Sequence, residues 1–301
     1  MTQPSPTQLS YLVSALDHGG WTGAAEDLGV STSAFAQGIS ELERRLGVSL
    51  FTKVGRNRVA TPEAVSAGAY ARAILGELES MESWAEEVRT GDVGQIRAGM
   101  IDTAAIHHFG ETLVRFRSVH PEVSVQLSVR PSAVLFEELR NGELDVVVAV
   151  APSDSTGLEL RELVAEPLYA YAPPGSTVRR VKDWGPWVGF PAASRTRELV
   201  TTELRRRGAD VNVVAESSQP AVLCEMVRLG MGWTVLSAVD AEREPHSLKR
   251  AIESPLTERI LTLARRTDRP ETQALVRFME MLINDAAVSK KSPASKKPRS
   301  T

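Results

Sequence analysis

The first part of the chain carries apolar residues at helical spacing. Four of them lie three and four positions apart before a glycine pair, which predicts an amphipathic helix that stops at Gly19-Gly20. They are Leu9, Leu12, Val13 and Leu16. Thr22 is expected to cap a short second helix, because its hydroxyl can accept a free backbone N–H. The inward side of that helix consists of Ala24, Ala25 and Leu28.

A third helix is predicted after the turn at Gly29-Val30. Ser31 or Thr32 can cap its N-terminus, and Gly47 ends it. Its inward side is expected to hold Ala34 or Phe35, with Ile39, Leu42 and Leu46. Two short helices around a glycine-containing turn are typical of a helix-turn-helix.

A β-hairpin and a long helix are predicted next. The apolar pair Leu50-Phe51 begins a strand, the turn at Gly55-Arg56 is basic, and a second strand returns to Val59. Thr61 then supplies an N-cap and Pro62 occupies the first helical position. These residues predict a wing followed by a helix over residues 62–90.

The long helix has an apolar seam with alternating steps of four and three residues. The seam consists of Ala67, Ala71, Ile74, Leu78, Met81, Ala85 and Val88. A heptad pattern over three repeats indicates packing against another helix. The seam could fold back onto its own chain, but we expect it to pair with a second copy and form a dimer.

From residue 95 to about 287 strands alternate with helices, which indicates an α/β domain. Apolar residues alternate over 123–129, and the continuous apolar run over 145–150 is typical of a strand buried on both faces. Further strands are predicted at 211–216, 233–236 and 260–264, and helices near 104–119, 132–141, 194–207, 219–229 and 271–287.

Composition narrows the class of protein. A length of 301 residues allows about two domains. The chain has no run of eighteen apolar residues, which argues against a membrane span, and the residues after Met1 lack the features of a signal peptide, so a cytoplasmic location is expected. A single cysteine, Cys224, excludes an intramolecular disulfide.

The net charge of −3 conceals a basic C-terminus. Five of the last thirteen residues are Lys or Arg and none is acidic, so removing that +5 leaves −8 for the rest. We expect residues 288–301 to form a solvated, disordered tail, because their composition offers little apolar surface to bury. Such a tail can add weak, salt-sensitive attraction to a polyanion.

Three N-terminal stretches carry a family resemblance. They are Ala24-Ala25-x-x-Leu28-x-Val30-Ser31, Ile39-x-x-Leu42-Glu43-x-x-Leu46-Gly47-x-x-Leu50-Phe51 and Gly55-Arg56. Together they resemble the winged helix-turn-helix of LysR-type transcriptional regulators. The turn Asn141-Gly142-Glu143-Leu144-Asp145 is similar to one that this family uses before a strand of its first lobe.

The resemblance implies a fold class for the whole chain, α+β and then α/β. It places a winged helix-turn-helix at 1–61, a linker and dimerisation helix at 62–93, and a two-lobed α/β effector domain, similar to periplasmic binding proteins, at 94–287. Lobe one would comprise 94–164 with 266–287, and lobe two 165–265. The family further implies cytoplasmic homodimers or homotetramers, joined through the linker helix and effector domains, that bind double-stranded DNA and a small-molecule effector.

The candidate DNA-binding residues lie on the second and third helices and the wing. They are Thr22, Ser31, Thr32, Ser33, Ala36, Gln37, Lys53, Arg56 and Arg58. Gln37 can make a bidentate pair with adenine, and the basic side chains of the wing can contact phosphates. Thr32 and Ser33 either reach the DNA or only cap the helix. Arg44 and Arg45 are expected to belong, at least in part, to a solvated helix end.

The third helix departs from the family pattern at Ala36-Gln37-Gly38, where the family commonly has polar residues and a cation. Gly38 presents no side chain and costs about 1 kcal/mol of helix propensity relative to Ala. This departure predicts a different operator preference rather than a loss of DNA binding.

The candidate effector-binding residues follow predicted strands, where helix N-termini favour anions. They are Asp102, Thr103, Ser132, Ala193, Ser194, Ser217 and Ser218. Each hydroxyl can serve as a helix cap or as a ligand contact. Asp102 disfavours a simple carboxylate ligand unless a cation lies nearby, which Arg130, Arg195 or Arg197 could supply.

Catalysis and a resident cofactor are not expected. The chain has no nucleophile elbow, phosphate loop or dinucleotide fingerprint. His107 and His108 diverge on a helix and therefore do not form a metal site, and Cys224 lies in an apolar helical run that predicts an inert thiol. We expect an effector-controlled transcription regulator; the alternatives are a regulator without a small-molecule effector and a binding-protein-like enzyme with an appended helical domain.

Overall fold

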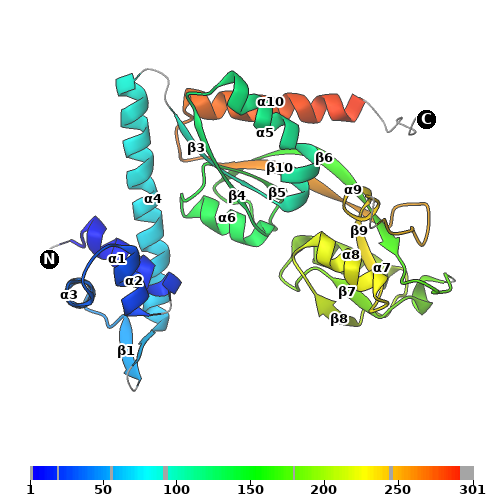
Figure 1. Cartoon of the computed structure of the whole chain (residues 1–301), viewed down its shortest axis with the longest axis horizontal. Helices are drawn as coiled ribbons and strands as arrows, with labels where there is room; N and C mark the ends of the chain where they lie inside the picture. Colours follow the sequence, from blue (N-terminus) through cyan, green and yellow to red (C-terminus); the bar gives the residue numbers. More distant parts are fainter. Residues whose placement is uncertain are drawn as a thin grey trace. The chain divides into compact units, whose positions relative to one another are not determined.

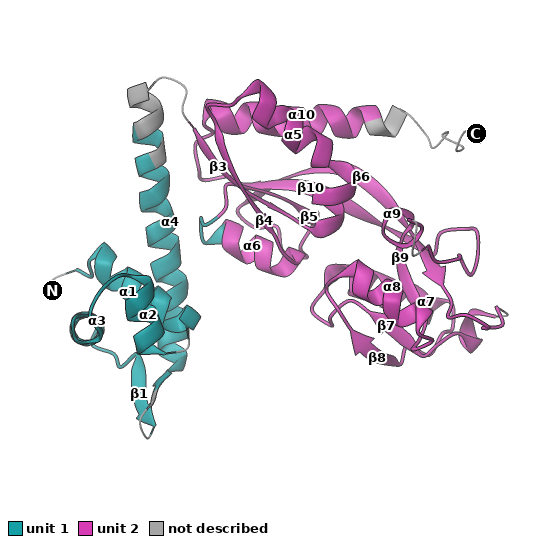
Figure 2. Ribbon diagram, viewed as in Figure 1, with its two compact units in different colours: residues 1–91, 140–143 teal, residues 92–139, 144–301 magenta. Residues whose placement is uncertain are grey.

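In a computed structural model of the chain, the described residues are 3–18, 20–54, 57–90, 94–178, 180–243 and 247–291. They form two compact units (Figure 2). The first comprises residues 1–91 with 140–143, and the second comprises 92–139 with 144–301.

The first unit is a helix-turn-helix followed by a hairpin and a long helix (Figure 1). Its elements are α1 (Pro6–His18), α2 (Trp21–Asp27), α3 (Thr32–Leu46), β1 (Phe51–Val54), β2 (Asn57–Ala60) and α4 (Pro62–Thr90). Leu12, Phe35, Ile39, Leu42 and Leu50 are fully buried in its core. The predicted helix-turn-helix and the antiparallel wing are confirmed.

Three of the four predicted helix-end residues lie at helix ends in the structure. The Ser31 hydroxyl accepts the N–H of Ala34 at 3.2 Å, and Gly47 ends α3 at φ 72°. Thr61 caps α4. The prediction for Thr22 is wrong: α2 is capped at Gly20 and begins at Trp21, so Thr22 is its second residue.

Trp21 and Leu46 lie at the two ends of the helix-turn-helix, and they differ in burial. The Trp21 ring packs edge-on against Phe35 and Phe51, with ring centroids 6.0 and 5.8 Å apart, so the first residue of α2 is part of the core. Leu46, predicted to be buried, is 41% exposed because it lies in the last turn of α3, where Gly47 reverses the chain.

Gly38 is a packing requirement of the helix-turn-helix. A Cβ atom at this position would lie 2.3 Å from Cδ2 of Tyr11. The Tyr11 ring stacks on Phe35 with centroids 5.0 Å apart. The absence of a side chain at Gly38 therefore lets α1 and α3 approach closely, which the helix propensity of glycine alone does not indicate.

The apolar seam of α4 is covered over its first half only. Ala71 of the seam is fully buried in the first unit, as is Ala64 one heptad before it. Farther along the helix, the seam residues Ile74 and Met81 are 48% and 57% exposed in the single chain, and Trp84, which lies outside the seam, is 56% exposed. The second half of the seam therefore presents large apolar side chains to the surroundings of the chain.

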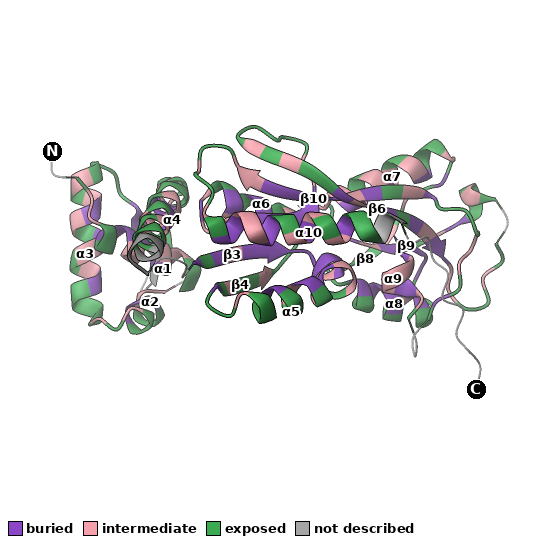
Figure 3. Ribbon diagram, turned by 90° about the horizontal axis from the view of Figure 1, so that it is seen from above, coloured by how far each residue is buried: buried purple, intermediate pink, exposed green. Residues whose placement is uncertain are grey.

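The second unit is built on a six-stranded mixed sheet of order β4-β3-β5-β10-β6-β9. Its strands are β3 (Gln95–Met100), β4 (Ser124–Val129), β5 (Val146–Val150), β6 (Leu158–Tyr171), β9 (Thr234–Ser237) and β10 (Thr257–Arg266). Strands β3, β4 and β5 are parallel, whereas β10 runs antiparallel to β5 and β6. Buried residues, purple in Figure 3, extend along β3.

Helices and a second, two-stranded sheet complete two lobes. The first lobe adds η1 (Ala104–His108, a π-helix), α5 (Gly110–Val119), α6 (Ser132–Arg140) and α10 (Gln273–Lys291). The second adds η2 (Val181–Asp183), β7 (Trp187–Gly189), α7 (Arg195–Arg206), β8 (Val213–Glu216), α8 (Pro220–Arg228) and α9 (Ala238–Ala241). Each lobe has its own buried apolar clusters, and β6 and β10 run through both (Figure 1).

The sequence pattern found most of these elements but missed the longest strand. No strand is predicted over residues 158–171, since exposed charged residues such as Arg161 and Glu162 interrupt its apolar positions. Helix α10 extends to Lys291, beyond the predicted end at 287, and residues 292–301 of the predicted tail lie outside the described residues.

We predict that Gly38→Ala lowers the thermal stability of the protein, although alanine normally stabilises a helix by about 1 kcal/mol relative to glycine. The new methyl group would meet the Tyr11 ring, and overpacking of this kind costs about 1–3 kcal/mol. Thermal unfolding followed by circular dichroism measures the effect. Gly23→Ala in α2 is the matched control, because its Cβ would meet nothing closer than 3.9 Å. A Gly38→Ala protein as stable as the Gly23→Ala control contradicts the packing role.

Candidate DNA-binding and effector sites

The exposed face of α3 brings several candidate DNA-binding residues together. Thr32, Ser33 and Gln37 are exposed, whereas Ala36 is half-buried. The Ser31 hydroxyl is used as the helix cap and also lies 3.1 Å from the hydroxyl of Ser33. Thr32 and Gln37 therefore keep their polar groups free of any hydrogen bond seen among the described side chains.

The wing adds two exposed cations beside this helix-turn-helix. Lys53 and Arg58 are register partners on β1 and β2, so their backbones lie side by side. The Arg58 guanidinium stacks over the Trp21 ring, 4.9 Å from its centroid. This cation–π contact holds Arg58 at the start of α2. Arg56, the third predicted cation of the wing, lies outside the described residues.

The end of α3 is less available for phosphate contacts. Arg44 and Arg45 both donate to Glu41, at 2.6 and 2.7 Å. The hydrogen bonds from Arg44 and Arg45 lower the pKa of Glu41 to about 2. Both cations are therefore paired with an acid on their own helix, in agreement with their interpretation as a helix end.

The candidate effector residues of the first lobe lie at the carboxyl ends of parallel strands. Asp102 and Thr103 follow β3, and Ser132 begins α6 after β4. The Asp102 carboxylate accepts the N–H of Thr103 at 2.9 Å. Burial raises the pKa of Asp102, and the nearby Asp240 charge adds to this effect. Thr103 is itself only 1% exposed.

The candidate residues of the second lobe also gather at one sheet edge. Ser194 occupies the N-cap position of α7, with no hydrogen bond from its side chain to the helix. The N–H of Ser217 bonds the carbonyl of Gly189, which places the end of β8 beside the end of β7. Ala193 and Ser218 are exposed next to them. Each lobe therefore assembles its predicted set at strand ends; their contact with a ligand stays a prediction.

A buried polar network lies beside Thr103, and its charged members were missed by the sequence analysis. Arg259 on β10 donates to Glu166 on β6 at 2.6 Å, and both side chains are at most 5% exposed. The same guanidinium donates to the Thr103 hydroxyl at 3.0 Å and to Asp240 at 3.3 Å. Because these residues are far apart in the sequence, no local pattern connects them.

Two adjacent histidines of η1 contact different carboxylates of this network. His108 lies 2.9 Å from Glu166, and His107 lies 3.5 Å from Asp240. Burial alone would raise the pKa of Glu166, but the His108 hydrogen bond and the Arg259 charge hold it below its ordinary value. Burial lowers the pKa of His107, although the nearby Asp240 charge acts in the opposite direction. Among the described residues, no group of three or more potential ligands could hold a metal ion.

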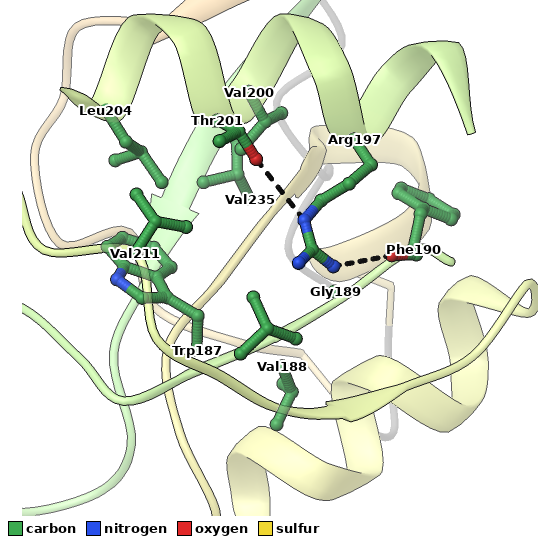
Figure 4. A pocket seen from close by; sticks show the side chains of 11 residues that line it. Trp187, Val188, Gly189, Phe190, Arg197, Val200, Thr201, Leu204, Val211 and Val235 are labelled. Atoms are coloured by element: carbon green, nitrogen blue, oxygen red, sulfur yellow. Dashed lines mark hydrogen bonds between the residues drawn. The ribbon is translucent and has the colours of Figure 1, made fainter. Parts of the chain in front are cut away.

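A pocket in the second lobe lies between α7 and the β7–β8 sheet (Figure 4). Apolar side chains such as Trp187, Val200 and Leu204 line it. Arg197 donates to the Phe190 carbonyl at 2.7 Å and to the Thr201 hydroxyl at 3.2 Å. The sequence suggested Arg197 as a cation for an anionic effector, but these bonds use it to tie α7 to β7.

Solved structures of other proteins share this architecture. CbnR, a LysR family transcriptional regulator, aligns with a TM-score of 0.69 and 19% identity over 94% of this chain and 99% of its own. A full-length OxyR variant from Pseudomonas aeruginosa aligns with a TM-score of 0.63 and 20% identity over 99% and 100% of the two chains. The effector binding domain of QuiR in complex with shikimate aligns with a TM-score of 0.57 and 15% identity over 65% of this chain and 98% of that domain.

Related sequences are named as transcription regulators. An uncharacterized HTH-type transcriptional regulator, YfeR of Shigella flexneri, is 27% identical over 87% of this chain and 88% of its own length. EstR of Acinetobacter baylyi is 32% identical over 55% of each chain. None of the described helices has the length and apolar character needed to cross a membrane. Residues 6–65 match the bacterial regulatory helix-turn-helix of the lysR family and residues 89–287 the LysR substrate binding domain, so the chain belongs to the LysR family of DNA-binding transcription regulators.

Proposed function

We propose that this regulator reads duplex DNA with α3 and the wing, and that a small molecule bound to its two-lobed domain controls it. The observation that carries the DNA part is the exposed face of α3 beside the cations of the wing, Lys53 and Arg58. A helix of this kind reads the major groove with residues near its N-terminus, where Thr32, Ser33 and Gln37 lie. A solved complex of CbnR with its target DNA supports this use of the fold.

The domain assignment and the assembly belong to the same proposal. We assign residues 1–61 to DNA binding, 62–93 to the linker helix and 94–287 to the effector domain, followed by the basic tail. The exposed Ile74, Met81 and Trp84 on α4 support pairing of two linker helices, since apolar side chains of this size are usually covered. Further contacts between effector domains would extend the dimer to a tetramer, and the regulator would act in the cytoplasm.

The effector site is proposed at the strand ends of the two lobes. Asp102, Thr103 and Ser132 would form its first side, and Ala193, Ser194, Ser217 and Ser218 its second. The shikimate complex of the QuiR effector domain supports a small-molecule ligand for this fold. The regulators among the curated relatives support a role in transcription rather than catalysis.

We predict that Arg58→Ala weakens DNA binding to a similar extent on all sequences and reduces the salt slope by about one ion. Gln37→Ala should instead change sequence preference, at a cost of about 1–3 kcal/mol on the preferred site. Fragments retained from a random duplex library and titrations at several salt concentrations measure both effects. Arg206→Ala, an exposed cation of the second lobe, is the control for lost charge. An Arg58→Ala protein with unaltered affinity and salt slope rules out the role of the wing.

The effector proposal predicts a ligand-dependent rise in melting temperature. A molecule present at 100 times its Kd stabilises the protein by about 2.7 kcal/mol. A thermal-shift screen with a metabolite panel that includes shikimate measures this effect. Ser194→Ala combined with Ser217→Ala should reduce the shift without altering the melting temperature of the free protein by more than a few degrees. If no panel member shifts the melting temperature, a regulator without a small-molecule effector is favoured.

Peroxide sensing is disfavoured by the state of Cys224, although relatives include a probable hydrogen peroxide-inducible genes activator from Streptomyces viridosporus. Burial raises the pKa of Cys224 to about 11, and the side chain is 5% exposed in the core of the second lobe. This shift disfavours the thiolate, which is the form that reacts with peroxide. We therefore predict that hydrogen peroxide leaves DNA binding of the wild type and of Cys224→Ala equally unchanged. Loss of binding in the wild type alone contradicts this expectation.

A further inference from the structure

The carboxylate of Asp240 is surrounded by hydrogen-bond donors. The Ser237 hydroxyl donates to it at 2.8 Å and the Thr103 hydroxyl at 3.0 Å. The Arg259 guanidinium donates at 3.3 Å, and the His107 ring nitrogen lies 3.5 Å away. Two hydroxyls and a guanidinium around one carboxylate make the kind of site with which proteins bind carboxylate ligands.

This site lies where the two lobes meet. Leu163 and Leu261 belong to the apolar cluster of the first lobe, and Leu168 and Leu256 to a cluster of the second. Between these positions Glu166 and Arg259 are register partners on β6 and β10. The buried ion pair therefore occupies the part of the two-stranded ribbon that lies between the two apolar clusters.

The partners of Asp240 come from both sides of this crossing. Thr103 follows β3 at the edge of the first lobe, whereas Asp240 lies on α9, whose Ala241 packs in a cluster of the second lobe. The side chain of Asp240 is 3% exposed, and Thr103 and Ser237 are each 1% exposed. Water consequently has little access to the carboxylate, and the Thr103 and Ser237 hydroxyls donate their hydrogen bonds to it.

We infer that Thr103, Ser237 and Arg259 form an anion site that the chain fills with its own Asp240 carboxylate, and that this contact joins α9 to the end of β3. A free small carboxylate cannot occupy these donors in the wild-type protein. Removal of the Asp240 carboxylate opens the site to a monocarboxylate of the same size. The inference goes beyond the proposed effector function and does not depend on which effector binds.

Removal of the Asp240 carboxylate would leave three donors of the site without this acceptor. Arg259 would keep Glu166 as its partner. The Thr103 and Ser237 hydroxyls would lose the carboxylate to which they donate their hydrogen bonds. Asp102 remains as a neighbouring carboxylate, and its N–H partner is the backbone of Thr103. His107 and the exposed Arg243, which lies within hydrogen-bond distance of its ring, complete the surroundings.

The experiment is chemical rescue of full-length Asp240→Ala. This substitution removes one carboxylate group, which formate matches in size and charge. Thermal unfolding is measured in sodium formate, acetate and chloride at equal ionic strength. We expect the melting temperature to fall by several degrees in chloride and to rise saturably with formate, recovering more than half of the loss, with a smaller rise in acetate. The wild type should respond equally to the three salts.

Two further variants separate anion binding from general salt effects. Asp240→Asn keeps an oxygen acceptor and fills the space, so formate should not rescue it. Asp240→Ala combined with Thr103→Val removes one donor of the site and should lose most of the formate response. If Asp240→Ala does not fold in chloride, its refolding yield with and without formate replaces the melting temperature. A variant as stable as the wild type, or an equal formate response in Asp240→Ala and Asp240→Asn, overturns the inference.

Discussion

The guanidinium of Arg259 and its three oxygen partners set the geometry of the effector domain at the point where its lobes join. A buried cation is costly unless each of its donors finds an acceptor, and here Glu166, Asp240 and Thr103 supply them. Apolar residues could fill the same volume, but they would not select these partners. The network therefore joins β6, β10, η1 and α9 through buried contacts.

This arrangement limits what an effector can do at the end of β3. Thr103 stands at the position that suits a ligand contact, yet its hydroxyl already accepts from Arg259 and donates to Asp240. Asp102 beside it is a partly exposed carboxylate whose pKa is raised by burial. A ligand at this edge would thus contact the Asp102 carboxylate, an acceptor, whereas the Thr103 hydroxyl already donates its hydrogen bond to Asp240. A change in the Asp240 contact would also alter the connection between the lobes, which gives the domain a physical route from ligand to conformation.

Close packing plays the corresponding role in the DNA-binding unit. The Tyr11 ring lies over Gly38 and on Phe35, and Trp21 packs against Phe35 from another direction. The same Trp21 ring carries the Arg58 guanidinium of the wing. The aromatic core therefore connects the angle between α1 and α3 to the placement of a cation that we assign to DNA. The presence of a glycine at position 38 of α3 is therefore explained by packing, independently of base readout.

Signals between neighbouring residues predicted most of the local elements and their order. Helical spacing, the caps at Ser31 and Thr61 and the stop at Gly47 fixed α3 and α4, because caps and periodicity depend on neighbours along the chain. The seven candidate effector residues also reached strand ends as predicted, since parallel strands share an edge. Thr22 shows the limit of this approach: the extended Gly20 is the N-cap of α2 and Trp21 its first residue, so the cap preference of threonine did not predict where the helix begins.

Contacts between residues far apart in the chain were not predictable from local patterns and follow from the assembled fold. Arg259 and Thr103 are 156 positions apart, and neither has a local signal that names the other. The strand over 158–171 exists because β10 and β9 pair with it on either side, although its own pattern of charged residues hides it. Burial, pairing and charge balance at the lobe junction are properties of the assembled fold, because they arise from segments that only folding brings together.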